Sequence, residues 1–438
     1  MKTNLLVGTA LLLASSSTFA APETPDVTAA PVTKQSIPLN ELRIFAEVLE
    51  GIKTSYVDEV GDSTLINNAI KGMLYQLDPH SAYLEPKDFE DLQVSTSGEF
   101  GGLGIEIGMK DGYVEVITPL DDTPADVAGI LPGDLIMQLN DQPVQGMSLS
   151  ESIEIMRGPV GSDIDLLILR QGETEPLEFT ITRDKIQITS ARSKTLESGI
   201  GYLRISQFQS DTAQEALKQI QKLQEEAPLK GLILDLRNNP GGVLGAAVDM
   251  SDLFLTEGNI VHTKGRNDEA GFSYDATPEE EIMGLPIMVL VNGGSASAAE
   301  IVAGALQDHH RALIAGTRTF GKGSVQSVIP LYNDHALKLT TSRYYTPSGR
   351  TIQAKGIEPD ILIEPAKLEI IENYFAGYRE ADLRGHLENE DTPEQETTNP
   401  EQSNSKKISS TDYQLYEAIR ILKGIILSES YNAISAIQ

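Results

Sequence analysis

The spacing of apolar residues divides the chain into three stretches of different character. Between residues 39 and 77, apolar positions recur every three or four residues, which predicts two amphipathic helices. From 98 to 183, short apolar runs alternate with turn signals and predict a small, mainly β domain. Within it, Ser148 followed by Glu151 is a capping box that predicts the start of a helix.

The stretch from 199 to 365 alternates between buried-strand patterns and helical patterns. The strands expected there lie at 229–236, 286–291, 312–315 and 325–331, and the helices at 243–255 and 296–306. This order predicts an α/β fold with a sheet core. Residues 380–411 are polar and mostly acidic, so we expect a linker without a packed core, and 413–427 regains helical spacing.

The N-terminus resembles an export signal. Lys2 precedes an apolar run from Leu5 to Ala14, and a small residue, Ala20, stands at the expected cleavage point. A run of about ten residues is too short to span a bilayer, and an N-terminal core helix is the alternative interpretation. No other segment is apolar for about 18 residues, so we expect no membrane span after the signal is cleaved.

Composition excludes several classes of function. The net charge of −30 argues against binding nucleic acid through its phosphates and against a polybasic membrane-surface protein. The absence of Cys excludes disulfides, thiolate metal sites and Cys nucleophiles. An exported chain without Cys is typical of the bacterial periplasm, where we expect this protein to reside.

The segment 286–300 is a candidate nucleophile turn. A buried strand runs into Gly293-Gly294, then Ser295-Ala296-Ser297, and then a helix. Such a turn exposes a hydroxyl at a helix N-terminus, where free N–H groups stabilise an anion. From this segment alone, a Ser-rich N-cap without chemistry is an equally good interpretation.

Lys322 is the candidate base. It lies between Gly321 and Gly323, and burial would lower its pKa enough for it to accept a proton. An ordinary surface Lys in a turn is the alternative. His309 and His310 are more typical of a solvated helix end than of a catalytic base.

A third segment, 232–242, is an apolar strand that ends in Asn238-Asn239-Pro240-Gly241-Gly242. Backbone N–H groups at such a glycine pair can face an oxyanion. A phosphate-binding loop is the rival, but the required Gly-x4-Gly-Lys-Ser/Thr spacing is missing. Glycine pairs are common in turns, so this segment is weak evidence by itself.

Taken together, these segments resemble the carboxyl-terminal processing peptidases, also called tail-specific proteases. The similarity runs in family order over roughly residues 39–365. It rests on sequence matches at 78–81 (Asp-Pro-His-Ser), 201–205, 234–242, 292–300, 321–326 and 344–350. The resemblance implies an α/β peptidase core with an N-terminal helical segment and an inserted PDZ domain. It also implies a Ser–Lys serine endopeptidase that needs no metal or cofactor.

The resemblance assigns roles residue by residue. It implies that Ser297, rather than Ser295, is the nucleophile, that Lys322 is the base, and that Gln326 holds Lys322 in place. It implies an oxyanion hole formed by the backbone N–H groups of Ala298 and of Gly241 or Gly242. Lys322 and Gln326 would lie about 13 Å apart on a straight strand, so contact requires a bend, which Gly321 and Gly323 would permit.

The middle segment resembles PDZ modules at Gly102-Leu103-Gly104-Ile105. The resemblance implies that this turn holds a substrate's C-terminal carboxylate while the peptide adds as a β-strand, with Leu103 and Ile105 lining the side-chain pocket. Arg157 would link a bound tail to the active site, although a plain surface Arg is the alternative.

We therefore expect a periplasmic endopeptidase that recognises free, apolar protein C-termini and cleaves near them. The expected divisions are 1–20 signal peptide, 21–38 linker, 39–97 helical segment, 98–184 PDZ domain, 185–375 peptidase core, 376–411 acidic linker and 412–438 C-terminal helix. The last two parts suggest docking of an adaptor protein or formation of a homo-oligomer. The rival hypotheses are a non-catalytic PDZ scaffold and a structural protein of the cell envelope.

Overall fold

The computed structural model describes residues 38–368 and 411–435, except 121, 198, 267–270, 279–281 and 283, together with 384 and 387. The expected signal peptide, the first linker and most of the acidic linker lie outside the described residues. The chain forms two compact units, residues 1–69 and 70–438. Within the described part, no helix is both long enough and apolar enough to traverse a bilayer.

The first unit contains helix α1 (Leu39–Ser55) and the beginning of α2 (Asp62–Tyr75). Both helices were expected from the apolar spacing. α1 buries none of its residues, and most of its apolar side chains, including Phe45 and Val48, are exposed. This helix therefore presents an apolar face that none of the described residues of its unit covers.

The middle segment folds around a sheet of the order β3-β4-β5-β7-β8, with the short β6 paired to β5. Its elements are β3 (Ile105–Lys110), β4 (Tyr113–Pro119), α4 (Pro124–Ala128), β5 (Leu135–Leu139), β6 (Gln142–Pro143), α5 (Leu149–Met156), β7 (Asp163–Leu169) and β8 (Leu177–Thr182). The predicted capping box is confirmed: Glu151 N–H donates to Ser148 Oγ, and Ser148 N–H donates to Glu151 Oε2.

The middle segment is connected to the rest of the chain by two paired strands. β2 (Glu99–Gly102) enters it and β9 (Asp184–Gln187) leaves it, and the two run antiparallel. Just outside this ribbon, Ile188 N–H donates to Gly98 O at 2.7 Å. Entry and exit of the inserted segment therefore lie side by side.

The α/β core is a six-stranded sheet of the order β10-β11-β12-β15-β16-β19, parallel from β11 onward. Its strands are β10 (Ala191–Thr195), β11 (Ile200–Ile205), β12 (Gly231–Asp235), β15 (Ile287–Val291), β16 (Ala312–Gly316) and β19 (Ile361–Leu362). Every residue of β12 and β15 is buried, as the continuous apolar runs predicted.

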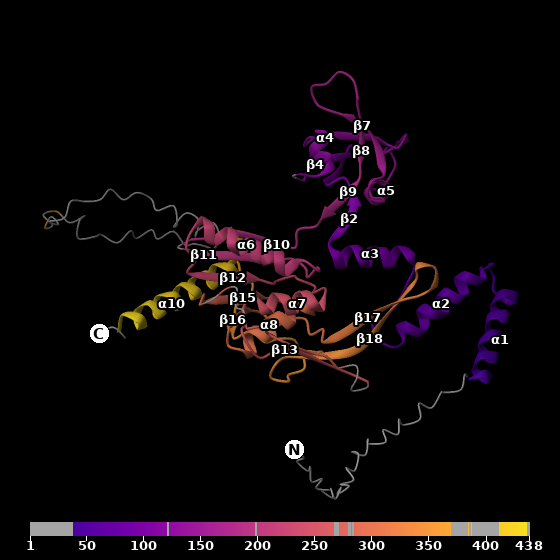
Figure 1. Cartoon of the computed structure of the whole chain (residues 1–438). Coiled ribbons are helices and arrows are strands. Elements are labelled where there is room, and N and C mark those ends of the chain that lie inside the picture. Colours follow the sequence, from indigo (N-terminus) through magenta and orange to yellow (C-terminus); the bar gives the residue numbers. More distant parts are fainter. Residues whose placement is uncertain are drawn as a thin grey trace, which may run out of the picture. The chain divides into compact units, whose positions relative to one another are not determined.

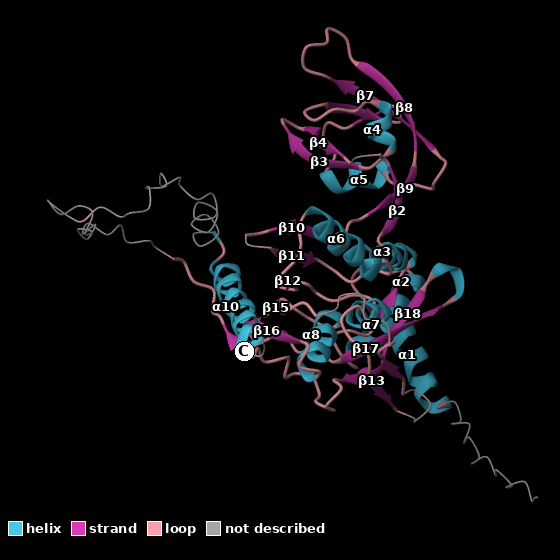
Figure 2. Ribbon diagram, turned by 60° about the vertical axis from the view of Figure 1, so that its left-hand side comes forward, coloured by secondary structure: helices cyan, strands magenta, loops and turns pink. Residues whose placement is uncertain are grey.

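Alternate residues of these strands face two different layers. Leu232 and Val289 pack with α6 (Thr212–Glu226), α7 (Leu244–Asp252) and α8 (Ala298–Asp308). Ile233 and Met288 pack instead with α10 (Tyr413–Ser435). Figure 2 shows α10 on one side of the sheet and α7 and α8 on the other. The predicted helix at 413–427 is thus part of the core packing.

A second sheet contributes the other wall of the site. Its members are β1 (Ala82–Leu84), β13 (Asn259–Gly265), β14 (Ser273–Asp275), β17 (Ser324–Pro330) and β18 (Ala336–Tyr345). β17 and β18 form a long antiparallel hairpin, visible in orange in Figure 1, whose loop contains the short 3-10 helix η2 (Tyr332–Asp334). The strand expected at 325–331 is β17, whereas β18 was not expected from the sequence. Helix α3 (Pro86–Ser97) follows β1 along the chain.

Candidate active site

Ser297 lies at the turn between β15 and α8, as the strand–glycine–serine pattern predicted. It is the N-cap residue of α8, with φ of 56° and ψ of −114°. A positive φ is uncommon for a residue other than Gly and costs conformational energy. The turn therefore holds Ser297 in a strained conformation, as nucleophile turns at strand–helix junctions do.

The neighbouring Ser295 has a different position. It is fully buried, its Oγ donates to Leu236 O at 2.7 Å, and the same oxygen accepts from Asn292 N–H at 3.0 Å. Both capacities of this hydroxyl are therefore used to join the end of β15 to the loop after β12. Ser297 is the serine of this turn that lines the cavity described below.

Lys322 and Gln326 are in contact. Lys322 Nζ donates to Gln326 Oε1 at 2.8 Å. The distance expected on a straight strand does not apply, because β17 begins only at Ser324 and its pairing with β18 has a bulge between Val325 and Gln326. Gly321 provides part of the predicted bend with φ of +94°.

Gly323 was expected to permit the bend between Lys322 and Gln326, but the structure gives it a different role. It has no left-handed φ, but a Cβ at this position would lie 2.5 Å from Gln353 N. This glycine is therefore required for the close approach of two backbone segments rather than for the bend itself.

The surroundings of Lys322 lower its pKa from the ordinary value. Burial of the ammonium is the largest cause, the positive charge of Lys338 acts in the same direction, and the charge of Glu300 opposes both. A larger neutral fraction makes the amine a better proton acceptor near pH 7. The environment is thus the one a Lys base requires.

Glu300 connects the Ser297 turn to the Lys322 loop. This carboxylate is fully buried and accepts four hydrogen bonds. Oε2 accepts from Ser297 N–H at 2.8 Å and from Lys322 N–H at 2.9 Å, and Oε1 accepts from Thr319 Oγ1 and from Gly321 N–H. A single side chain therefore fixes the backbones of both candidate catalytic residues.

Two backbone N–H groups are available for an oxyanion. Gly241 N–H donates to Asn239 Oδ1 at 2.9 Å and is thus engaged. Within the described part of the chain, the N–H groups of Gly242 and Ala298 have no hydrogen-bond acceptor. Both residues line the same cavity as Ser297, and Gly241 does not. A Cβ on Gly241 would lie 2.6 Å from Ser297 Cβ, so this glycine is needed for close packing beneath the serine.

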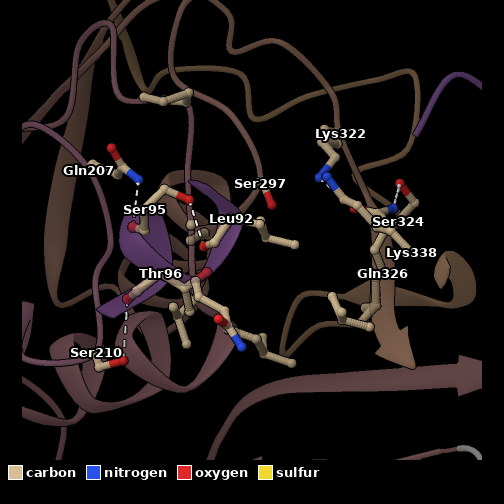
Figure 3. A pocket seen from close by; sticks show the side chains of 18 of the residues that line it. Leu92, Ser95, Thr96, Gln207, Ser210, Ser297, Lys322, Ser324, Gln326 and Lys338 are labelled. Carbon is tan, nitrogen blue, oxygen red and sulfur yellow. Dashed lines mark hydrogen bonds between the residues drawn. The ribbon is translucent and has the colours of Figure 1, made fainter. Parts of the chain in front are cut away.

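These groups surround one cavity of about 700 Å³. Figure 3 shows Ser297 on one side and Lys322, with Gln326 beside it, on the other. Leu92, Ser95 and Thr96 of α3 also line the cavity, and no His is among the described residues that line it. Among the described residues no hydrogen bond joins Ser297 Oγ to Lys322 Nζ.

Tyr344 closes the cavity from β18. Its side chain is buried, and its hydroxyl donates to the backbone oxygen of Lys322. Burial raises the pKa of Tyr344, and its hydrogen bond with Ser297 acts in the opposite direction. The phenol stays neutral at physiological pH and contacts both candidate catalytic residues.

Sequence reasoning did not identify Glu300, Lys338 or Tyr344. Glu300 stands three residues after Ser297, which is the spacing of a capping box, so this signal was present in the sequence. Lys338 and Tyr344 lie on β18, which was not expected, and nothing local to these two residues indicates that they face the cavity.

A second, smaller pocket of about 260 Å³ lies in the middle segment. It collects the predicted peptide-binding residues together with further apolar side chains: Phe100, Gly102, Leu103, Gly104, Ile105, Ile107, Ile153, Met156 and Arg157. The Arg157 guanidinium stacks over the Phe100 ring at 4.7 Å and lies 3.9 Å from Asp91 on α3. Arg157 is therefore at once part of this pocket and near the helix that lines the larger cavity.

The described residues include no group of three or more His, Asp or Glu side chains that could hold a metal ion. His309 Nε2 instead bonds to Asn259 O at 2.8 Å, which is a structural contact.

Comparisons with known proteins match all three parts of the chain. The profile of peptidase family S41 matches residues 199–363, that of the PDZ domain matches 115–170, and that of the activating protease CtpB N-terminal domain matches 5–88.

Curated relatives extend over most of the chain. The carboxy-terminal-processing protease of Bartonella bacilliformis is 44% identical over 394 residues, which is 89% of this chain and 90% of that protein. The carboxyl-terminal-processing protease of Synechocystis sp. is 38% identical over 69% of this chain and 72% of that protein. Carboxy-terminal processing protease CtpA of Bacillus subtilis is 35% identical over 72% of this chain and 67% of that protein.

Among solved structures, the photosystem II D1 C-terminal processing protease is 31% identical. The match covers 74% of this chain and 93% of that chain, with a TM-score of 0.42.

Proposed function

Because this chain belongs to the carboxy-terminal processing proteases of peptidase family S41, we propose that Ser297 and Lys322 perform its serine protease chemistry. The observation that carries the proposal is the shared cavity. Ser297, Lys322 with its lowered pKa and two unengaged backbone N–H groups all line it or face it. Each participant that acyl transfer needs is thus present without a His or a metal ligand.

The chemistry begins with proton transfer. Neutral Lys322 Nζ takes the proton of Ser297 Oγ as that oxygen attacks the substrate carbonyl carbon. The negative charge that develops on the carbonyl oxygen is stabilised by Gly242 N–H and Ala298 N–H. Lys322 then gives its proton to the leaving amine, and a water molecule, deprotonated by the same Lys, releases the acyl group from Ser297.

The PDZ domain selects the substrate by its free C-terminus. Its pocket has a floor of Leu103, Ile105, Ile107 and Met156, which suits an apolar terminal side chain. Arg157, whose partner Asp91 is 3.9 Å away and exposed, retains the capacity to attract a terminal carboxylate. Substrates on this proposal are proteins with apolar C-terminal residues, cut near that end.

The cell compartment and the partners follow from two further observations. The signal-like N-terminus and the absence of Cys support export to the periplasm. The exposed apolar face of α1 is suited to a homo-oligomer contact or to an adaptor protein.

Labelling with a fluorophosphonate probe tests the mechanism. The wild-type protein should be labelled at Ser297 and should degrade an unstructured substrate, whereas Ser297→Ala and Lys322→Ala should do neither at a measurable rate. Circular dichroism of the variants controls for folding. Substantial turnover by folded Lys322→Ala would refute the Ser–Lys assignment. Tight binding of C-terminal peptides with no turnover by the wild type would instead favour the non-catalytic PDZ scaffold.

A further inference from the structure

The segment Asp-Pro-His-Ser at 78–81 has no role in the mechanism above, yet it lies directly behind the catalytic side chains. Asp78 Oδ1 accepts from His80 N–H at 2.8 Å and from Ser81 N–H at 2.9 Å, and Oδ2 accepts from Ser81 Oγ at 2.7 Å. Such a turn, closed by an Asp side chain, is a stable local structure. The carboxylate still accepts one more hydrogen bond.

That further bond comes from β18. Thr340 Oγ1 donates to Asp78 Oδ1 at 3.1 Å, and Thr340 N–H donates to Ser81 Oγ at 3.1 Å. Two contacts therefore join the turn to one residue of the long hairpin. Asp78 and Thr340 are 262 positions apart along the chain, so this is a tertiary contact and not a local one.

Thr340 continues the chain of hydrogen bonds toward the active site. Gln326 Nε2 donates to Thr340 Oγ1 at 3.2 Å and to Ser324 Oγ at 2.9 Å. At the other end of the same amide, Gln326 Oε1 accepts from Lys322 Nζ at 2.8 Å. Asp78 is thus connected to the candidate base through Thr340 and Gln326.

The chemistry of these groups determines which atom donates and which accepts in each of these hydrogen bonds. An ionised carboxylate only accepts hydrogen bonds, so the single hydroxyl proton of Thr340 is committed to Asp78. The Thr340 oxygen can then only accept a hydrogen bond from Gln326, and the amide nitrogen is the atom of Gln326 that can donate it. This arrangement turns the amide oxygen toward Lys322. A Gln amide has almost the same shape in either orientation, so a neighbour must choose between the two.

Asp78 is ionised near neutral pH, where the orientation of the Gln326 amide affects Lys322. Burial raises its pKa, but the hydrogen bonds from Ser81, His80 and Thr340 together outweigh burial and hold the pKa below the ordinary value. The carboxylate is therefore an acceptor throughout the neutral range.

We propose that Asp78 is a positioning residue of the active site, which acts through Thr340 to orient the Gln326 amide with its oxygen toward Lys322 Nζ. This inference rests on the proposed Ser297–Lys322 mechanism. With the oxygen toward Lys322, the amide accepts one amine hydrogen and leaves the nitrogen lone pair free for the Ser297 proton. With the amide reversed, its N–H would occupy that lone pair and oppose the ammonium formed during the reaction.

Asp78→Asn is the direct test. Asn retains an oxygen that accepts from His80 N–H and Ser81 N–H, so the turn persists. Its amide nitrogen takes the place of Oδ2, facing Ser81 Oγ, and its neutral oxygen has only two lone pairs, which the N–H groups of His80 and Ser81 occupy. The Thr340 hydroxyl, the third donor to Oδ1, loses its acceptor and is free to turn to Gln326, which favours the reversed amide. We expect kcat to fall by on the order of tenfold to a hundredfold, with KM little changed because the PDZ pocket is untouched.

The pH profile separates this role from a purely structural one. The charged and titratable groups facing Lys322 are Lys338 on β18, Glu300 on α8 and His80 on the turn. Asp78→Asn leaves Lys338 and Glu300 in place and removes a charge that raises the pKa of His80, so this imidazole becomes more fully neutral. A reversed amide disfavours the Lys322 ammonium, so the rising limb of kcat/KM should move to lower pH while its plateau falls. Competitive acetylation of Lys322, read by mass spectrometry across pH, should show the same displacement without relying on turnover.

A double-mutant cycle with Thr340→Val isolates the relay. Valine removes the hydroxyl at nearly constant shape and should lower kcat to a similar extent as Asp78→Asn. The double variant should be no worse than either single one, because both break the same connection. Additive losses would overturn the proposal and leave Asp78 as a turn-closing residue only.

A matched control lies elsewhere in the core. Asp252 also accepts from a Thr hydroxyl and a Thr backbone N–H, both of Thr277, and does not line the active-site cavity. Asp252→Asn should leave kcat and the pH profile unchanged.

The outcomes distinguish this inference from the mechanism it rests on. If folded Lys322→Ala retains turnover, the proposed mechanism fails. If Lys322→Ala is inactive while Asp78→Asn has the wild-type rate and pH profile, the positioning role alone fails.

Discussion

Replacing Glu300 with Gln tests how the active site is assembled. The side chain keeps its size, but a buried carboxylate that accepts four hydrogen bonds becomes an amide with one acceptor atom. The change is therefore confined to hydrogen bonding and charge. No other atom of the turn or of the loop is removed.

The loss in the free energy of unfolding depends on which of two orientations the new amide adopts. If its nitrogen replaces Oε2, the N–H groups of Ser297 and Lys322 both lose their acceptor. If its nitrogen replaces Oε1, Thr319 Oγ1 can turn to accept from it, and only Gly321 N–H is left unpaired. The second arrangement costs less: about 1–3 kcal/mol for the unpaired N–H, and about 1 kcal/mol for each bond that is no longer charge-assisted.

Removing a buried charge recovers part of this loss, because a neutral amide is less costly to bury than a carboxylate. We therefore expect the free energy of unfolding to fall by about 2–4 kcal/mol. For a domain of this size that corresponds to a decrease in Tm of roughly 5–15 °C.

Calorimetry and peptide-cleavage kinetics measure the two consequences together. Glu300→Gln should lower both Tm and kcat, since it releases the backbones of Ser297 and Lys322. Glu225→Gln, an exposed acid on α6, is the control and should change stability by no more than about 0.5 kcal/mol. A folded Glu300→Gln protein with unchanged Tm and kcat would refute the assembly role of this carboxylate.

Three other changes have expected outcomes. Gln326→Glu places a carboxylate beside Lys322, which favours the ammonium and raises its pKa, so the rising limb of kcat/KM should move to higher pH; a limb that stays in place would mean that Lys322 is not the titrating base. Ser295→Ala should cost about 1–3 kcal/mol in urea unfolding, because Asn292 N–H loses its acceptor, while its kcat per folded molecule should stay near the wild-type value. Gly104→Ala should weaken capture of C-terminal peptides in fluorescence anisotropy, because its Cβ would lie 2.3 Å from the Thr123 side chain at a φ of +77°. Amidated peptides should bind poorly to the wild type for a related reason, and equal binding of acid and amide forms would contradict C-terminal recognition.

Local patterns in the sequence were sufficient for the α/β core. β12 and β15 are continuous apolar runs because both faces of a parallel strand are covered, and such runs are legible without any tertiary knowledge. The strand–glycine–serine turn before α8 is equally local. The candidate nucleophile and base could therefore be proposed from short segments and from the family resemblance.

The second sheet could not be predicted in the same way. β18 has an intermediate burial pattern over most of its length, so its residues show neither a clean alternation nor an apolar run. Lys338, Thr340 and Tyr344 acquire their roles only when β18 pairs with β17, and Asp78 only when β1 pairs with β18. Contacts between residues far apart in sequence leave no periodic signal.

The salt bridges around Arg237 illustrate the same limit. Arg237 belongs to the segment that ends at Gly242, and it pairs with Asp235 two residues before it and with Asp412 at the start of α10. The first partner is local. The second is 175 positions away, beyond a stretch whose composition predicts only a linker.

The paired strands β2 and β9 also affect how this enzyme can change over time. Because Gly98 and Ile188 are joined by a hydrogen bond, the ends of the inserted PDZ domain meet at one point on the core. If the segment between these two residues were removed, a short turn could join the two ends, and no strand of the peptidase sheet would change its place or its pairing. The same junction would accept another recognition module of similar end-to-end spacing. The domain that chooses the substrate and the domain that cleaves the bond can therefore evolve independently. A chimaera made at this junction would keep its chemistry while acquiring a different set of substrates.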